Sequence, residues 1–397
     1  MTSILIEQRA KALESKLIEL RRYFHQNPEL SHNEFQTSEA IAIYLSNLGL
    51  DVRKGIGKTG VVGILSGSKP GPCIAMRADI DALPVPELNN KSYCSKNQGI
   101  SHACGHDAHI AISLGVAEVL CHLRNSLNGT IKFIFQPAEE ISLADSNGGA
   151  YSMIHDGVLE NPTISKIYAL HVMPTIESGY IGYNSEAVWA SNDMLEIIVK
   201  GKKTHGAYPH TGIDSILVAS HIFISLQNMI SRSLDAQDPF LISFGVIEGG
   251  NQFNVLPDRV RMAGMFRALS PEVRRIVPSK IKQILDGITT AFGADYELNI
   301  TPGVPVTINN AEMLSDALLL LKEILGTEKV LYTKTQMGAE DFSLFAERVP
   351  ALYLLLGVGN KSRGITSMLH TPEFDIDESS LVLGVNLFSQ LISRNLL

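Results

Sequence analysis

The sequence predicts an α/β protein in which helices cover a mixed β-sheet and a second, smaller domain is inserted into the first. Three observations predict this class. Short apolar runs alternate with amphipathic helical patterns in residues 1–184, as they do in sheets that are covered on both faces. From 185 to 302 the order of elements becomes β-α-β-β-α-β, which is a self-contained unit. The first pattern resumes in residues 303–397, so the middle domain interrupts the outer one.

The first part contains helical patterns and then apolar strands. Apolar residues recur at helical spacing in 13–24 and 41–48, where Asn27-Pro28 and Gly49 supply the stop signals. Strands are predicted at 61–65, 73–76, 131–135 and 167–170, and a helix at 108–123. In such sheets ligands gather beyond the carboxyl ends of the strands. Five polar residues fall at these ends: Asp79, Asp81, Glu139, Glu140 and His171.

The remaining elements follow from the same patterns. In the inserted domain we expect a strand at 194–199, a helix at 215–230, strands at 240–247 and 259–266, a helix at 272–292 and a strand at 296–300. After this domain we expect a helix at 310–325, an apolar strand at 352–356 and a final helix at 379–393.

Composition and charge exclude several classes of partner. The 397 residues are 45% apolar and 19% charged, which is typical of a globular protein with an ample core. A net charge of −8 disfavours binding to nucleic acid or to an acidic membrane surface. No stretch approaches the roughly 20 uninterrupted apolar residues of a membrane span, and no signal-like run precedes the first charges. The four cysteines are sparse and are interpreted as reduced thiols. We therefore predict a cytoplasmic protein.

Two short stretches hold side chains that suit a metal centre. Residues 101–109 (SHACGHDAH) combine a thiol, three imidazoles and a carboxylate, and residues 136–140 (QPAEE) place two adjacent carboxylates after an apolar strand. Thiolate, imidazole and carboxylate are all metal ligands, and a spare carboxylate beside a metal suits a base that deprotonates water. A hydrolase with a metal centre is therefore the first hypothesis.

Each motif also has an interpretation that needs no metal. Cys104 and His106 suit a loop that clamps an ion, but such a pair taken alone is more often a buried thiol and a core histidine. Glu139 and Glu140 taken alone are equally consistent with a solvated acidic loop. A cysteine hydrolase that uses Cys104 with His106 is a further alternative. It is disfavoured because residues two apart in a loop seldom align a thiol on an imidazole, and because it leaves both glutamates unused.

Eight motifs, in order, resemble those of the amidohydrolase branch of the M20 metallopeptidase family. They lie at 22–30 (RYFHQNPEL), 76–84 (MRADIDALP), 102–109 (HACGHDAH), 136–140 (QPAEE), 205–210 (HGAYPH), 254–258 (NVLPD), 337–342 (MGAEDF) and 370–374 (HTPEF). The resemblance implies a catalytic α/β domain, residues 1–184 and 303–397, that carries an inserted ferredoxin-like lid, residues 185–302. It also implies a homodimer that forms through the lid.

The resemblance further implies a site with two metal ions. The residues that match the family's ligands are Cys104, His106, Glu140, His171 and His370. Glu139 matches the general base, and Asp81 matches an acidic residue that supports the ligands. In the lid, His205 matches a residue that contacts the scissile carbonyl. Asn254 and Arg267 fall where related enzymes hold the substrate's carboxylate, although Arg267 is equally consistent with a solvated strand arginine.

The implied activity is metal-dependent hydrolysis of the amide bond of a small N-acyl amino acid. Branch members include hippurate hydrolases, aminoacylases and auxin-conjugate hydrolases. Thiolate and imidazole favour Zn, whereas the carboxylates also admit Mn, Co or Ni. The alternatives are a dipeptidase or an N-acetyl-diaminopimelate deacetylase of the same fold. A non-catalytic metal-binding homologue is disfavoured, because a protein that only binds has no need of Glu139.

Two segments depart from the family pattern. Residues 141–147 form a longer link after the glutamates than the usual Gly-rich one. Residues 264–269 (GMFRAL) keep Arg267 but change its neighbours. Neither departure affects the proposed ligands, but both bear on the shape of the pocket and on the choice of substrate.

Overall fold

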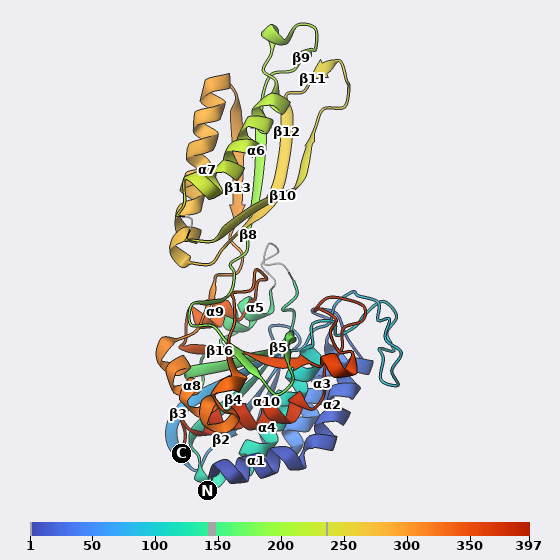
Figure 1. Cartoon of the computed structure of the whole chain (residues 1–397), viewed down its shortest axis with the longest axis vertical. Coiled ribbons are helices and arrows are strands. Elements are labelled where there is room, and N and C mark those ends of the chain that lie inside the picture. The colour runs from blue at the N-terminus through green and yellow to red at the C-terminus, as the bar shows by residue number, and fades with distance from the viewer. Residues whose placement is uncertain (1, 142–147, 236) are drawn as a thin grey trace. The chain divides into compact units, whose positions relative to one another are not determined.

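A computed structural model of the chain describes residues 2–141, 148–235 and 237–397, which divide into two compact units. Unit 1 comprises Met1–Val188, Ile308–Lys334 and Asp341–Leu397, and unit 2 comprises Trp189–Thr307 and Thr335–Glu340. Each unit has its own sheet and its own apolar core (Figure 1). The predicted fold class, a helix-covered mixed sheet with a second and smaller αβ unit, is confirmed.

Unit 1 is built on an eight-stranded mixed sheet. In spatial order the strands are β1 (Asp51–Ile56), β2 (Gly60–Ser66), β4 (Asn128–Gln136), β3 (Lys69–Asp79), β5 (Ile164–Glu177), β16 (Ala351–Gly359), β6 (Ile181–Tyr183) and β15 (Val330–Tyr332). The four central strands, β4, β3, β5 and β16, run parallel. Their carboxyl ends therefore meet at one edge of the sheet, where the candidate residues follow β3 and β4.

Helices cover both faces of this sheet (Figure 1). One layer contains α4 (His106–Cys121), α10 (Ser380–Ser393), α1 (Thr2–Ala12), α2 (Glu14–Gln26) and α3 (Phe35–Asn47). The opposite face carries α5 (Gly149–His155) and α9 (Ser343–Ala346), and α8 (Ala311–Leu325) packs on β16. Nearly every residue of α4 is buried, because α4 lies between the sheet and the outer helices. The first residue of this core helix is the candidate ligand His106.

Unit 2 contains the predicted β-α-β-β-α-β order. Its elements are β8 (Asp193–Lys200), α6 (Ser215–Arg232), β10 (Phe240–Gly249), β12 (Arg259–Ala268), α7 (Pro271–Phe292) and β13 (Asp295–Thr301). The strands form an antiparallel sheet in the order β10-β12-β8-β13, and both helices lie on one face of it (Figure 1). Leu195, Ile197 and Val199 of β8 are buried beneath the helices and alternate with more exposed residues.

Two pairs of short strands lie outside these two sheets. β9 (Thr204–His205) pairs with β11 (Val255–Leu256), and β7 (Ala187–Trp189) pairs with β14 (Thr307–Ile308). Within the described ranges, no helix is both long enough and apolar enough to cross a bilayer.

Several elements differ from those predicted. α1 was not predicted, because it buries only Ile6 and Ala10 and so has no apolar stripe. β1 was missed for a similar reason, since this edge strand is largely exposed. β5 was predicted to end near Leu170 but continues to Glu177, so His171 lies within the strand and not at its end. The helix predicted at 272–292 is α7, which begins only one residue earlier, at Pro271, after the N-cap Ser270.

Candidate metal centre

Cys104 and His106 are brought together by the glycine between them. Gly105 has a φ of 85°, and a Cβ at this position would lie 2.3 Å from Cγ2 of Val172. Only glycine accommodates both the left-handed backbone and this close approach. The turn therefore packs directly against β5 beside His171, and His106 begins α4.

Asp81 fixes the orientation of the His106 ring. Nδ1 of His106 lies 2.9 Å from the Asp81 backbone oxygen and 3.3 Å from its Oδ1. We assign the ring proton to Nδ1, because both of these neighbours are acceptors. In the neutral ring Nε2 presents a lone pair, and this buried atom has no hydrogen-bond partner among the described residues. An imidazole held by a carboxylate on one nitrogen is the usual arrangement of a metal-ligating histidine.

The Cys104 sulfur lies between two further imidazoles. Its Sγ is 3.4 Å from Nε2 of His171 and 3.3 Å from Nε2 of His370. The His370 loop is tied to the Cys104 turn, because the His370 backbone N–H donates to the Ala103 oxygen at 2.8 Å. His370 itself has a φ of 63°. Its side chain is 52% exposed, whereas Cys104 and His171 are buried, so the cluster is open to solvent on the side of His370.

Glu139 and Glu140 turn towards this cluster immediately after β4. The turn depends on Ala138, which has a φ of 50°. Its N–H donates to Oε1 of the buried Glu34 at 2.9 Å. The Glu140 backbone N–H donates to Oδ2 of Asp81 at 3.0 Å. An oxygen of each glutamate and a nitrogen of His106 lie within 4.8 Å of one another, so the two carboxylates converge on the same space.

The donor atoms have the spacing that a metal ion requires. Ligand atoms about 2.0–2.3 Å from a tetrahedral ion lie roughly 3.3–3.8 Å from one another. Oε1 of Glu140 is 3.4 Å from Nε2 of His370, within this range, and 3.9 Å from Nε2 of His106, just beyond it. This oxygen is also buried and has no hydrogen-bond partner among the residues described. Two buried polar atoms that face each other without hydrogen-bond partners would be costly unless an ion lies between them. The residues therefore fit a metal centre.

Cys104 belongs to two groups of donors, each of which could hold one metal ion. One group contains Cys104, His106 and His171, and the other contains Cys104, Glu140 and His370. In each group the donor atoms lie within 4.8 Å of one another. A thiolate carries a full negative charge and is well placed to be shared between the two groups.

Charges around the centre favour a bound cation. Burial, together with the negative charges of Glu140 and Glu139, raises the pKa of the Cys104 thiol well above its ordinary value. Burial and the neighbouring His109 lower the pKa of His171, so that its imidazole stays neutral. Burial also lowers the pKa of His106, but the charge of Asp79 and the hydrogen bond to Asp81 raise it to about 10. Ligation would displace protons from Cys104 and His106, so metal affinity increases with pH.

Two buried residues in the centre were not predicted as site residues. Nδ1 of His109 hydrogen-bonds to Asp79, and Nε2 accepts the Val172 backbone N–H at 3.0 Å. Both nitrogens of His109 are thus engaged, so it positions β5 instead of ligating. Asp79 is in turn held by Arg77, whose Nη1 donates to it at 2.7 Å. In the sequence, His109 is one of the three imidazoles of 101–109 and Asp79 is one of the polar residues that follow predicted strands, but neither was assigned a role in the site.

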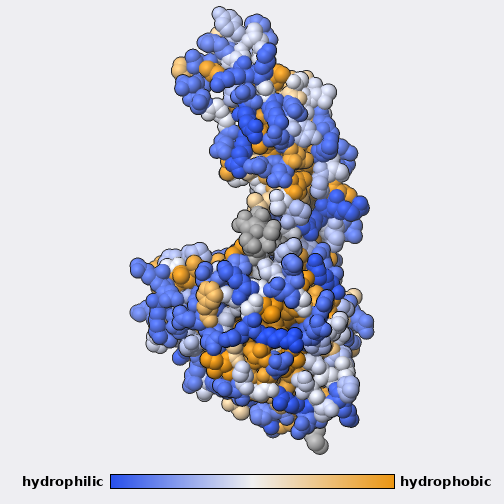
Figure 2. All heavy atoms as spheres, turned by 180° about the vertical axis from the view of Figure 1, so that it is seen from behind, coloured by the Kyte–Doolittle hydropathy of each residue, from blue (hydrophilic) through white to orange (hydrophobic). Residues whose placement is uncertain are grey.

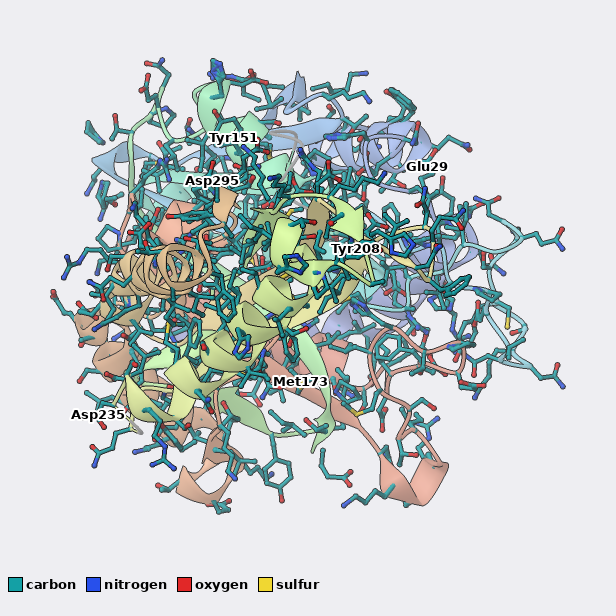
Figure 3. All side chains as sticks on the ribbon, turned by 90° about the horizontal axis from the view of Figure 1, so that it is seen from above. Glu29, Tyr151, Met173, Tyr208, Asp235 and Asp295 are labelled. Atoms are coloured by element: carbon teal, nitrogen blue, oxygen red, sulfur yellow. The ribbon has the colours of Figure 1, made fainter. Side chains whose placement is uncertain are left out.

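The predicted substrate residues His205, Asn254 and Arg267 belong to unit 2. His205 lies on β9 opposite Val255 of β11, and the Asn254 backbone oxygen accepts the Gly206 N–H at 2.8 Å. The β9–β11 pair therefore brings His205 and Asn254 together. The ring of Tyr208, labelled in Figure 3, is centred 5.8 Å from that of His205.

Arg267 lies elsewhere in unit 2, on β12. It is half-buried, and its Nη1 donates to the Met337 backbone oxygen at 2.7 Å. Burial lowers the pKa of its guanidinium. Among the described residues, no carboxylate lies within ion-pair distance of it. Of the long link predicted at 141–147, residues 142–147 lie outside the described residues.

Comparisons with known proteins identify a family and several similar proteins. The model of peptidase family M20/M25/M40 matches residues 75–394. Thermostable carboxypeptidase 2 of Saccharolobus solfataricus is 37% identical over 376 residues, 94% of each chain. N-acetylcysteine deacetylase of Bacillus subtilis is 35% identical over 382 residues, 96% of this chain and 97% of its own. The crystal structure of the Bacillus subtilis YXEP protein, a dinuclear metal-binding peptidase, is 34% identical and has a TM-score of 0.84. It covers 97% of this chain and 98% of its own.

The fold and the donor set define a class, that of metal-dependent amidohydrolases. The chain belongs to peptidase family M20/M25/M40. The predicted resemblance is therefore confirmed, and the relatives include proteins of its amidohydrolase branch.

Proposed function

We propose that the protein removes the acyl group from the nitrogen of an amino acid, with two divalent cations held by five residues: Cys104, His106, Glu140, His171 and His370. The observation that carries this proposal is the convergence of Glu139 and Glu140 on the gap faced by His106. Relatives named N-acetylcysteine deacetylase and IAA-amino acid hydrolase support the choice of an N-acyl amino acid.

In the proposed hydrolysis, each of these residues has a separate role. When bound, the cations would polarise the amide carbonyl and lower the pKa of the attacking water. Glu139 takes a proton from this water and delivers it to the amine nitrogen as the C–N bond breaks. Asp81 holds both the His106 ring and the Glu140 backbone. His205 and Asn254 of unit 2, the proposed lid, supply hydrogen bonds to the substrate's carbonyl and carboxylate.

A peptidase that cleaves next to a free carboxyl terminus is the second candidate, because two relatives are named carboxypeptidases. An N-acyl amino acid and such a peptide share a free α-carboxylate beside the scissile amide. Assays of the metal-loaded protein on N-acetyl amino acids and on dipeptides, with release of free amine as the readout, distinguish the two. Faster cleavage of the dipeptides would reject the first candidate.

Arg267 is proposed to bind the substrate's α-carboxylate. Its guanidinium is half-buried without a carboxylate partner in the described parts of the chain, and it can offer a bidentate fork. We expect wild type to prefer an N-acyl amino acid over its carboxamide by roughly 10- to 150-fold in kcat/KM, the value of a charge-assisted contact of about 1.5–3 kcal/mol. Arg267→Ala should lose this preference. Equal rates of wild type on both substrates would show that the carboxylate is not recognised.

Unit 2 is also proposed to mediate dimerisation with a second copy of the chain. β10 is an edge strand of its sheet, and a groove of about 320 Å³ beside it is lined by Ile216, Ile224 and Ile247, among others. Ile224 and Ile247 are 57% and 54% exposed. Other apolar side chains interrupt the hydrophilic surface of both units (Figure 2). A second copy would cover both the open edge and the apolar groove.

We expect light scattering to show a dimer at micromolar concentration. Ile224→Glu should raise the dissociation constant at least about 10²-fold, because an unpaired charge would be buried in an apolar interface. Leu319→Glu is the matched control, since Leu319 is 64% exposed but lies on α8 of unit 1. A monomeric wild type would contradict the dimer, and an undisturbed dimer in Ile224→Glu would place the interface elsewhere.

A further inference from the structure

The motif at 22–30 and the residue before it have no part in the chemistry described so far, yet they contribute to a buried ionic cluster. Arg21 of α2 is fully buried and donates from Nε to Oδ2 of Asp107 at 2.8 Å. Its Nη2 donates to Oδ1 of Asp375 at 3.1 Å, and its Nη1 lies 3.4 Å from Oε1 of Glu378. One guanidinium therefore joins three carboxylates from two segments that are distant in the sequence.

These two segments carry candidate ligands of the metal centre. Asp107 directly follows His106 in the first turn of α4. Asp375 follows the loop of His370, and the Phe374 N–H closes a turn on the Thr371 oxygen at 3.2 Å. Arg21 thus joins the start of α4 to the end of the His370 loop. The centre itself contains neither Arg21 nor Asp375.

Further side chains tie the same two carboxylates in place. Nδ1 of His25, one turn after Arg21 on α2, lies 2.7 Å from the Asp107 oxygen that Arg21 also contacts. Nε2 of His25 lies 3.2 Å from Glu87. The Tyr93 hydroxyl donates to Oδ2 of Asp375 at 2.9 Å. Asp107 is therefore held by two side chains of α2, and Asp375 is held by one side chain of α2 and by Tyr93 of a separate segment.

The chemistry of the cluster indicates that it orients the residues beside the ligands and does not mainly stabilise the fold. Buried ion pairs are costly to desolvate, and apolar residues of similar volume often stabilise a fold equally well. A fork-shaped guanidinium, however, fixes the direction of each partner. Metal sites tolerate errors of only about 0.2 Å in ligand distance. A cluster that fixes the backbone beside two ligands is suited to meeting that tolerance.

We propose that Arg21 and His25 are positioning residues of the metal centre, acting on His106 through Asp107 and, for Arg21, on His370 through Asp375. This inference rests on the proposed metal centre. Loss of an outer partner of this kind typically lowers metal affinity 10- to 100-fold. The same range is expected here, although Arg21 acts one residue further from the metal than a direct partner of a ligand.

The test compares two neighbouring arginines in the full-length, metal-free protein. Arg21→Lys keeps the charge but loses the fork. Arg22→Lys is the matched control, because Arg22 also binds Glu378, at 2.9 and 2.6 Å, but its side chain is 41% exposed and its hydrogen bonds go to Glu378 and not to Asp107. Co²⁺ is the probe. Its affinity is measured by competition with a chelator, and its thiolate charge-transfer absorption reports on Cys104.

We expect Arg21→Lys to bind Co²⁺ about 10- to 100-fold more weakly, with a changed absorption spectrum, and Arg22→Lys to stay within about 2-fold of wild type. His25→Gln should show the same change as Arg21→Lys. It is the test variant if Arg21→Lys does not fold. Wild-type Co²⁺ affinity and spectrum in the folded Arg21 or His25 variant would overturn the positioning role alone. A wild-type protein that does not bind Co²⁺ would overturn the metal centre as well.

Discussion

Glu139→Gln is expected to lower turnover at least roughly 10²-fold while the content of bound metal stays nearly unchanged. The amide is nearly isosteric with the carboxylate, so the turn after Ala138 and the position of Glu140 should persist. The amide cannot accept a proton from water, however. The two carboxylates converge on His106 from adjacent positions, so one can ligate while the other acts as a base.

This expectation is checked by measuring kcat and metal content on the same preparation. Glu160→Gln is a suitable control, because it makes the same chemical change at an exposed residue of unit 1. Near-normal kcat in Glu139→Gln would remove Glu139 from the mechanism. A loss of metal together with activity would indicate that Glu139 is a ligand.

Cys104→Ala is expected to lower metal content and activity together, and added metal should restore activity only in part. The sulfur belongs to both groups of donors, so its loss affects both ions. Water can fill the space but does not replace the charge of a thiolate. The loss of affinity should exceed the roughly 10- to 100-fold cost of losing an outer-shell partner.

Cys73→Ala is the matched control for Cys104→Ala. Cys73 is also a buried thiol of unit 1, but it lies on β3 six residues before Asp79, away from the carboxyl end of the strand. Its replacement removes a thiol of the same size and should leave metal content unchanged. Full metal content in purified Cys104→Ala would instead show that Cys104 is a core thiol and that the proposed ligand set is wrong.

Periodic apolar patterns were sufficient to predict most of the fold. The strands of unit 1 that were predicted are those that are buried on both faces, and such strands have continuous apolar runs. In unit 2 one face of the sheet is covered, so its strands alternate and were equally recognisable. α1 and β1 lie at the periphery of unit 1, where few contacts constrain the side chains. Their sequences therefore carry little pattern.

The candidate site was predicted in its residues but not in its geometry. The motifs named Cys104, His106, Glu140, His171 and His370, and the structure brings their donor atoms together, although their role as ligands stays a prediction. The left-handed backbone at Ala138 and His370 could not be predicted, because a positive φ is uncommon for every residue type except glycine, including histidine. Both conformations are held by contacts from distant segments.

Residues that position the ligands indirectly were the hardest to identify from the sequence. Arg21 and Asp375 meet only in the folded chain, and an arginine on an amphipathic helix is ordinarily read as exposed. His109 lies in a recognised motif, but only its two hydrogen bonds show that it does not ligate. Such assignments need the partner atoms, which a single sequence does not identify.

The order of strands in unit 1 has a consequence for how the chain matures. β16 lies between β5 and β6, but it is made only after the whole of Trp189–Thr307 has been synthesised. A nascent chain that ends before β16 can pair all four strands of unit 2, whereas the sheet of unit 1 still lacks a central strand and His370. Closing that gap joins segments far apart in sequence and is intrinsically slow. On the proposed ligand set, we expect complete metal binding only after β16 and the His370 loop have been made, and a chain that ends before β16 would carry four of the five proposed ligands.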